Sequence, residues 1–316
     1  MFTRLRESIA MVGIIITLLS TPALATDFAR IGTSSVGGGF YLIGNTIAQV
    51  GNAINNGINY SAITGGSTKN LNDLAKGEIE FGMCQSATID QAIKGVEPFK
   101  APLKSLRFVA AIYPMPCHVL VSSKSGINSV AEFKGKRIDY GPIGAGIETY
   151  TRIILNAYDI KDSDVTINRY GKTESAEGLK TGEVDASFWT TTAPNAQVTD
   201  MISGGIRLLS IDEDKRQQII KENPYFALAT IPAGTYDNQT ADLNTIAPIG
   251  VLMSDEKVSE EIVYKTTKAL FENSKQLKER LPNYFATFNP ERALDGCILD
   301  IHSGALKYYK EVGIME

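Results

Sequence analysis

LAKGEIE at residues 74–80 and LKTGEVD at residues 179–185 are the two stretches that decide how this chain folds. In each, the end of a helical pattern is followed by a glycine and an acidic residue, and then by an apolar run. Glycine readily adopts the left-handed backbone that closes helices, and the apolar run is typical of a buried strand. The stretches begin 105 residues apart, at positions 74 and 179, and they predict that one helix–strand unit occurs twice.

A second pair of matches keeps nearly the same offset. Gly37-Gly38-Gly39 and Gly144-Ala145-Gly146 each lie between a predicted strand and the helix that follows it. A single match would be within reach of chance, whereas two in register indicate a repeated unit. The sequence therefore predicts two lobes of similar topology.

Strands and helices alternate in both halves of the chain. Strands are predicted at residues 28–32, 59–64, 79–84, 137–140, 165–170 and 184–189, and helices at 41–53, 68–76, 129–134, 148–157 and 174–180. Strands separated by helices of this length pair in parallel through crossovers. The predicted fold class is therefore α/β.

Two long extended stretches, residues 106–122 and 227–252, are predicted to connect the lobes as hinge strands. After the second stretch, Ser254 is predicted to cap a long helix that has Asp255 and Glu256 in its first turn and returns to the first lobe. On this reading the first lobe comprises residues 26–118 with 250–316, and the second, inserted lobe comprises residues 119–249.

The composition supports a folded chain of about two domains. The sequence has 316 residues, of which 43% are hydrophobic and 21% charged, and domains average roughly 150 residues. A formal net charge of −4 argues against a general nucleic-acid binder. With two histidines and three cysteines, a zinc hydrolase, a multi-cluster redox protein and a disulfide-dense module are all disfavoured.

The first 25 residues have the pattern of a signal peptide. Arg4 and Arg6 precede an apolar run at residues 9–19, and Ala23-Leu24-Ala25 offers small residues at a cleavage site. The run is shorter than the roughly 20 residues of a membrane span, although an N-terminal anchor stays an alternative. We expect cleavage near Ala25 and an exported, soluble, monomeric product.

Motifs of enzymes are incomplete in this sequence. Gly171-Lys172-Thr173 resembles the end of a phosphate-binding loop, but Thr166 stands where the first glycine is needed. Cys117 and His118 are neighbours in a predicted strand, so their side chains point to opposite faces, and a structural role is favoured for His118. We therefore predict no catalytic residue, no cofactor and no metal ligand. An odd number of cysteines leaves at least one free thiol, and no disulfide is predicted.

The glycine-rich loops favour a binding site instead. A helix N-terminus presents free N–H groups and a positive dipole end, which suit a carboxylate or phosphate. Gly65-Gly66-Ser67 adds a third such loop, and Ser34, Ser35 and Ser67 add hydroxyls. Aromatic residues flank these loops, namely Phe40, Tyr41, Phe188 and Trp189. Ordinary strand–helix turns remain the alternative for each loop, and core packing remains the alternative for Trp189.

Taken together, the motifs resemble the TAXI family, the TRAP-associated extracytoplasmic immunogenic proteins, over nearly the whole mature chain. The likeness rests on short motifs in a fixed order: Ile31-Gly32-Thr33, Gly37-Gly38, Tyr41, Gly66-Ser67, Asn70-Leu71, Gln85-Ser86, Tyr113-Pro114, His118, Gly141-Pro142, Gly144, Gly146, Ile231-Pro232-Ala233-Gly234-Thr235-Tyr236, Leu270-Phe271-Glu272, His302, Gly304-Ala305 and Tyr308-Tyr309-Lys310-Glu311-Val312-Gly313.

The resemblance implies a two-lobed periplasmic binding protein of type II topology with its ligand cleft between the lobes. It implies a receptor that captures a small organic solute, such as glutamate, glutamine or a related carboxylate, for an ion-gradient-driven TRAP permease. The ligand-binding residues it implies are Thr33, Ser34, Ser35, Gly38, Phe40, Tyr41, Gly66, Ser67, Asn70, Gln85, Tyr113, Pro142, Gly144, Ala145, Gly146, Ile147, Phe188 and Trp189.

Departures from the family pattern bear on the ligand. Val36, Phe40, Ala145 and Ile147 each remove a polar group that the family pattern has. Ala87 stands where an aspartate often follows Gln-Ser, and it removes a carboxylate that could meet an ammonium group. These changes favour a carboxylate without an amino group, or a more apolar one. Three alternatives remain open: the binding component of an ATP-driven importer, an exported enzyme of the same fold that uses Cys117 and His118, and a surface protein without transport.

Overall fold

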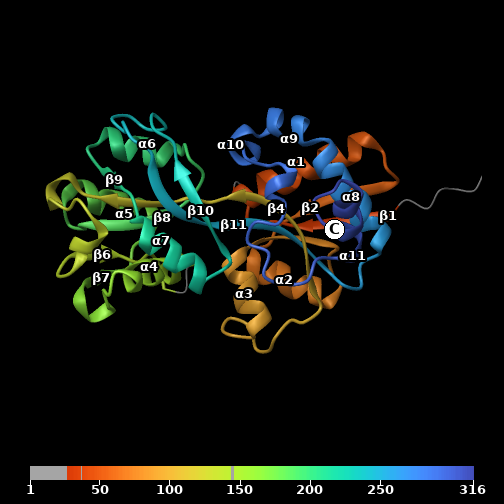
Figure 1. Ribbon diagram of the computed structural model, residues 1–316, viewed down its shortest axis with the longest axis horizontal. Coiled ribbons are helices and arrows are strands. Elements are labelled where there is room, and N and C mark those ends of the chain that lie inside the picture. The colour runs from red at the N-terminus through yellow and green to blue at the C-terminus, as the bar shows by residue number, and fades with distance from the viewer. Residues whose placement is uncertain (1–26, 37, 144–145) are drawn as a thin grey trace, which may run out of the picture.

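The computed structural model describes residues 27–36, 38–143 and 146–316. The predicted signal peptide and the site candidates Gly144 and Ala145 lie outside these residues. The chain forms two lobes that lie side by side along the longest axis, each with its own sheet covered by helices (Figure 1).

The first lobe begins with three strands, each followed by a helix. They are β1 (Asp27–Gly32), α1 (Gly39–Ile54), β2 (Ile58–Ile63), α2 (Ser67–Lys76), β3 (Phe81–Gln85) and α3 (Ser86–Lys94). The second lobe contains β5 (Cys117–Val121), β6 (Arg137–Asp139), α4 (Gly146–Ala157), β7 (Thr166–Asn168), α5 (Lys172–Thr181), β8 (Ala186–Thr190), α6 (Ala196–Ser203), β9 (Arg207–Leu209) and α7 (Glu213–Glu222). Short 3-10 turns accompany them at Ser123–Ser125, Val130–Phe133 and Asp162–Asp164. The predicted alternation of strands and helices is confirmed.

The two sheets have the same strand order. In the first lobe the order is β2-β1-β3-β11-β4, and in the second it is β7-β6-β8-β5-β9. In each, the first three strands are parallel and the fourth runs antiparallel to the third. This is the type II arrangement that the resemblance to the TAXI family implies.

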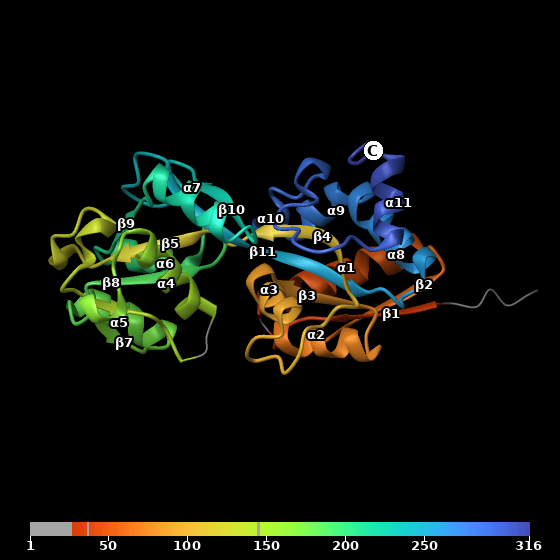
Figure 2. The ribbon, with the colours of Figure 1, turned by 60° about the horizontal axis from the view of Figure 1, so that its bottom comes forward.

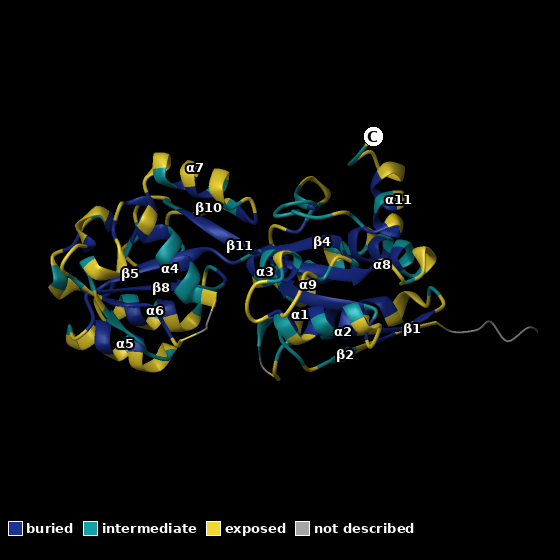
Figure 3. Ribbon diagram, turned by 90° about the horizontal axis from the view of Figure 1, so that it is seen from below, coloured by how far each residue is buried: buried dark blue, intermediate teal, exposed yellow. Residues whose placement is uncertain are grey.

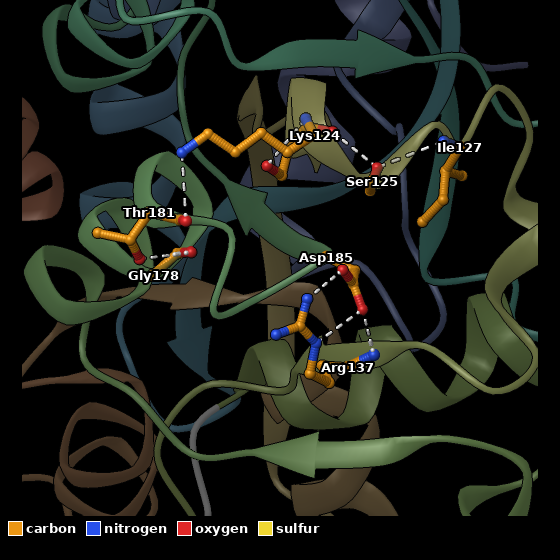
Figure 4. Close-up of polar contacts among 8 residues, drawn as sticks. Lys124, Ser125, Ile127, Arg137, Gly178, Thr181 and Asp185 are labelled. Atoms are coloured by element: carbon orange, nitrogen blue, oxygen red, sulfur yellow. Dashed lines mark hydrogen bonds and ion pairs between the residues drawn. The ribbon is translucent and has the colours of Figure 1, made fainter.

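The repeated stretches hold each sheet together in the same way. Gly77 and Gly182 close α2 and α5 in the left-handed conformation, with φ of 74° and 81°. The acidic residue that ends each stretch then accepts hydrogen bonds from the backbone N–H and the guanidinium of an arginine on the neighbouring strand. These pairs are Glu80 with Arg30, and Asp185 with Arg137, the second of which is drawn in Figure 4. The sequence repeat therefore corresponds to one structural device that occurs in both lobes.

Two long strands carry the chain between the lobes. β4 (Leu106–Pro114) lies in the first sheet and leads directly to β5 of the second. β11 (Leu243–Asp255) pairs with β10 (Phe226–Ile231) through its first half, and with β3 and β4 through its second half. Figure 2 shows the β4–β5 connection and β11 running side by side between the lobes. The prediction of one extended stretch over residues 227–252 was wrong, since β10 and β11 form an antiparallel pair and only β11 continues into the first sheet. The exact lobe boundaries stay a proposal.

The predicted helix start at Ser254 was also wrong. Ser254 and Asp255 end β11, and the Ser254 hydroxyl donates to the Glu80 carbonyl oxygen at 2.8 Å. Pairing with β4, together with this bond to the residue before β3, outweighs the local capping signal at this point. The helices of the C-terminal segment are α8 (Glu260–Glu272), α9 (Ser274–Arg280), α10 (Pro282–Phe285), a 3-10 turn at Pro290–Arg292, and α11 (Ser303–Glu311).

Both faces of each sheet are covered by helices. In the first lobe, α1, α8 and α11 pack on one face of the sheet, and α2 and α3 pack on the other. In the second lobe, α4 and α7 pack on one face, and α5 and α6 pack on the other. Figure 3 shows buried strands between helices whose outward faces are exposed. The return of the C-terminal segment to the first lobe is confirmed. No helix within the described ranges is long and apolar enough to cross a membrane.

Candidate ligand-binding site

The first glycine loop is organised around Ser34. The Ser34 hydroxyl accepts a hydrogen bond of 3.1 Å from the Tyr41 N–H, in the first turn of α1. Gly38 precedes α1 and has no side chain with which to cap it, so Ser34 supplies the cap from a distance. A Cβ atom on Gly38 would overlap with Ser34 Oγ. The loop therefore depends on both residues.

Aromatic side chains form a wall beside this loop. The rings of Phe40 and Tyr113 meet edge to face at 6.2 Å, and Tyr113 meets Tyr284 at 5.2 Å. The Tyr284 ring lies directly over the start of α1, because a Cβ on Gly39 would come within 2.9 Å of it. Tyr284 was missed by the sequence analysis. It lies on α10, far along the chain, and no local motif marks it.

The second loop, at Gly66 and Ser67, is held by Asn70. The Asn70 amide donates both of its hydrogens to backbone carbonyl oxygens, to that of Thr33 at 2.8 Å and to that of Met83 at 2.9 Å. Asn70 is 1% exposed. The Thr33 hydroxyl is likewise used within the protein, where it donates to the Ile63 carbonyl oxygen at 2.7 Å. Thr33 and Asn70 therefore position the loops around the site.

Gln85, at the end of β3, brings the two lobes into contact. Its Oε1 accepts a hydrogen bond of 3.1 Å from the Tyr150 hydroxyl on α4, while its backbone N–H donates to Ser67 Oγ at 3.1 Å. A Cβ on Gly146, the first residue of α4, would lie 3.3 Å from the same Oε1. The second loop of the first lobe and the start of α4 therefore converge on Gln85.

The second lobe has a small pocket at the carboxyl ends of its parallel strands. Its volume is about 60 Å³. It is lined by Asp139, Gly141, Pro142, Ile147, Tyr170, Lys172, Ser175, Phe188, Trp189 and Thr190. The structure thus brings together four predicted site residues, Pro142, Ile147, Phe188 and Trp189. The carboxyl end of a parallel sheet is where α/β folds bind ligands.

Asp139, which lines this pocket, is hydrogen-bonded through both of its carboxylate oxygens. Its Oδ1 accepts from the N–H groups of Gly141 and Tyr170, both at 3.0 Å, and its Oδ2 accepts from the Ser187 hydroxyl at 3.2 Å. The Ser175 hydroxyl donates in turn to Ser187 Oγ at 2.9 Å. This network shapes the pocket and holds the carboxylate away from other partners.

Lys172, the first residue of α5, was missed as a site candidate. Its Nζ lies 5.2 Å from the centroid of the Trp189 ring, a distance at which a cation is attracted to the ring face. The signal was present in Gly171-Lys172-Thr173, which lies between a strand and a helix. As the end of a longer phosphate-binding motif this tripeptide is incomplete, because Thr166 stands where the first glycine is needed.

The structural role predicted for His118 is confirmed. Its Nδ1 lies 3.0 Å from the Pro116 carbonyl oxygen, so Nδ1 carries the proton, and its Nε2 then accepts from the Tyr236 hydroxyl at 2.8 Å. Burial lowers the pKa of His118 to about 4 and raises the pKa of the Cys117 thiol to about 12. A neutral histidine and a protonated thiol are the reverse of an activated nucleophile pair.

The predicted residues thus form two groups, one in each lobe. Thr33, Ser34, Ser35, Gly38, Phe40, Tyr41, Gly66, Ser67, Asn70, Gln85 and Tyr113 surround the strand ends of the first lobe, and Pro142, Gly146, Ile147, Phe188 and Trp189 those of the second. Cys84, Cys117 and Cys297 are free thiols. Over the described part of the chain, no three His, Cys, Asp or Glu side chains gather as metal ligands would.

Comparison with known proteins gives a family and a fold. The NMT1-like family matches residues 31–313. A TctC solute binding protein from Polaromonas, solved without ligand, is 15% identical over 91% of this chain and 99% of its own, with a TM-score of 0.58. A periplasmic sulfonate-binding protein of a putative sulfonate ABC transporter, SsuA from Methylobacillus flagellatus, is 15% identical over 92% of this chain and 88% of its own, with a TM-score of 0.53. The predicted α/β fold of two-lobed periplasmic binding proteins is confirmed.

Proposed function

The chain belongs to the NMT1-like family, and on that premise we propose that it is an exported solute receptor that binds a small organic carboxylate between its lobes. The contact of Gln85 with Tyr150 and Gly146 carries this proposal, because it brings the strand ends of both sheets to one place. The solved structures that share the fold include proteins titled as solute-binding and sulfonate-binding proteins, which supports a receptor.

Binding would proceed without covalent chemistry. The carboxylate docks first at the N-termini of α1 and α2. Gly38 and Gly66, which precede these helices, have no side chain with which to cap them, although at α1 the Ser34 hydroxyl already accepts from the Tyr41 N–H. The second lobe then closes over the ligand about the β4–β5 and β11 connections. Closure excludes water, which strengthens each polar contact. Phe40, Tyr41 and Tyr113 provide the apolar wall on the first lobe.

The ligand that we propose lacks an amino group. Ala87 is buried in a cluster that also contains Tyr150, so this position offers no carboxylate to an ammonium group. The exposed side chain of Val36 adds apolar surface at the first loop. An organic acid without an amine, or one with a longer apolar body, therefore fits better than glutamate or glutamine.

We propose that the receptor delivers its solute to a TRAP permease, in line with the TAXI resemblance. The alternative is the binding component of an ATP-driven importer, which uses the same fold. A permease gene beside this gene, without an ATPase gene, would support the first, and an adjacent ATPase gene would support the second. We further propose export to the periplasm with cleavage near Ala25, which N-terminal sequencing of the secreted protein tests.

Native mass spectrometry of freshly purified protein tests the receptor function. We expect a bound organic acid, released on denaturation, and isothermal titration should then reproduce its binding. Tight binding of glutamate with none of aliphatic or 2-oxo acids would overturn the ligand class. If no small molecule is retained and no organic acid binds, the receptor function itself is wrong.

A further inference from the structure

We propose that the pocket of the second lobe is an anion subsite in which Lys172 pairs with a second acidic group of the solute. The receptor then selects dicarboxylates over monocarboxylates of the same length. This inference rests on the proposed function and names the substrate class of that site.

The pocket is placed to receive one end of a ligand that is held by both lobes. It lies at the carboxyl ends of β6, β7 and β8, and Ile147 of α4 forms part of its lining. Gly146, the residue before Ile147, is the part of α4 that lies against Gln85 of the first lobe. The pocket and the contact between the lobes therefore share the first turn of one helix.

The size of the pocket suits a group of a few heavy atoms. A volume of about 60 Å³ is several times what one water molecule needs, yet well below the roughly 300 Å³ at which whole-ligand sites begin. The pocket therefore accommodates an end group such as a carboxylate. The rest of the ligand extends toward the first lobe.

The charges in the pocket select an anion. Lys172 is the cation among the lining residues, and it forms no ion pair with any residue that the structure describes. Asp139, the carboxylate of the lining, already accepts three hydrogen bonds and is 2% exposed. A ligand therefore meets a cation whose charge is unmatched and an acid that is already satisfied.

The two lobes differ at the position of Lys172. Gly66 precedes α2 just as Gly171 precedes α5, and the offset of 105 residues places Ser67 opposite Lys172. In the first lobe the Ser67 hydroxyl accepts from the Gln85 N–H and serves the local structure. In the second lobe the same position carries a long cationic side chain over a tryptophan. The repeated unit thus differs at the residue that gives the pocket its charge.

Trp189 serves as a fluorescent reporter of this pocket. It is the only tryptophan in the sequence, so intrinsic tryptophan fluorescence arises there alone. Titration of the full mature protein with glutarate and adipate, and with valerate and hexanoate as monoacids of equal length, measures selection for a second carboxylate. Calorimetry of the same titrations reports binding anywhere on the protein.

Three variants complete the test. Lys172→Met removes the charge and keeps the length, Lys172→Arg keeps the charge, and Lys180→Met changes an exposed lysine at the other end of α5. We expect the wild type to bind one of the diacids at least about tenfold tighter than its matched monoacid, which corresponds to one charge-assisted hydrogen bond. Lys172→Met should abolish this preference and the change in Trp189 fluorescence, with monoacid affinity unchanged. Lys172→Arg and Lys180→Met should retain both.

The outcomes separate this inference from the function on which it rests. If acids bind but Lys172→Met leaves the diacid preference unchanged, or weakens diacid and monoacid equally, the subsite is wrong and the receptor function stands. If calorimetry finds no binding of any acid in the series to the wild type, the carboxylate function fails and the subsite fails with it.

Discussion

The Tyr150 hydroxyl donates a hydrogen bond of 3.1 Å to Gln85 Oε1 and so joins α4 of the second lobe to the end of β3 in the first. Tyr150 is 1% exposed, and its ring packs edge to face on Phe226 at 5.3 Å. The tyrosine is therefore fixed, and the bond orients the Gln85 amide from the second lobe. The orientation of a proposed ligand contact thus depends on how the two lobes sit together.

Tyr150→Phe should weaken ligand binding more than it weakens the fold. Loss of the hydroxyl leaves the ring packing in place but removes the partner of Gln85 Oε1, and the weak 3.9 Å bond from Nε2 to Met115 Sδ then holds the amide less firmly. We expect affinity for the organic acid to fall about threefold to tenfold, for one lost hydrogen bond of about 1 kcal/mol. Isothermal titration measures the affinity, and thermal unfolding measures the stability.

Tyr158→Phe is the matched control for this loss. The Tyr158 hydroxyl accepts a hydrogen bond of 2.8 Å from the Asp212 N–H, away from Gln85. This variant should lower the melting temperature by a few degrees and leave affinity unchanged. Equal affinities for Tyr150→Phe and the wild type would show that the Gln85 bond does not orient the ligand.

Neighbouring glycines of the second loop should respond in opposite ways to alanine. A Cβ on Gly65 would overlap with Asn70 Oδ1, and Asn70 cannot move because both hydrogens of its amide are bonded to the backbone. A Cβ on Gly66 would meet nothing within 4 Å. Gly65→Ala should therefore destabilise the protein by about 1–3 kcal/mol, and Gly66→Ala should be nearly neutral. Urea unfolding of the two variants decides this, and equal stabilities would refute the positioning role of Asn70.

The arginine–carboxylate pairs that end the repeated stretches should contribute to stability in both lobes. Burial works to raise the pKa of Asp185, but the hydrogen bonds and charge of Arg137 outweigh it, and the pKa is held below its usual value. Asp185→Asn should therefore cost about 1–3 kcal/mol of the free energy of unfolding. Glu80→Gln, which breaks the corresponding pair with Arg30, should have a similar effect.

A double-mutant cycle isolates each pair. Asp185→Asn, Arg137→Met and their combination, measured by denaturant unfolding, give the coupling energy directly. A coupling energy near zero would mean that the repeated acidic residue is retained for some reason other than this contact.

The sequence was sufficient for most of the fold because its strongest signals are periodic and local. The repeat at 74–80 and 179–185 predicts the matched lobes, and the alternation of strands and helices predicts the parallel sheets. Local signals failed where pairing between distant segments decides the structure. Ser254 has the surroundings of a helix cap, but it pairs with Arg107 of β4 as part of the sheet. The turn back from β10 to β11 was missed for the same reason.

The site was predictable in its loops and less so in its side chains. Glycine-rich turns before helices identified the strand ends of both lobes. The burial of Thr33 and Asn70, and the position of Tyr284 over α1, depend on contacts between segments that are far apart in sequence. Lys172 is different, because alignment of the two repeats would have placed it opposite Ser67. Which of these residues touch the ligand stays a prediction.

The protein should lose stability between about pH 6.5 and pH 4 through His118. Its pKa is about 4 in the fold and 6.5 when unfolded, because burial disfavours the charged ring. In that window the unfolded chain binds a proton that the folded chain does not, so stability falls as the pH falls. From pH 7 to pH 5 this histidine should account for a loss of about 2 kcal/mol.

Urea unfolding at a series of pH values tests this, because His118→Gln removes the titrating group. The variant is expected to be less stable at pH 7, since the bonds to Pro116 and Tyr236 change, but its stability should fall less steeply toward pH 5. The other histidine of the chain provides the control. The pKa of His302 is also lowered by burial. His302→Gln should therefore remove only the contribution of His302 to the fall in stability with pH, and the contribution of His118 should remain. If His118→Gln and the wild type lose stability in parallel between pH 7 and pH 5, then His118 is protonated in the folded protein, and its bond to Tyr236 does not have the geometry described above.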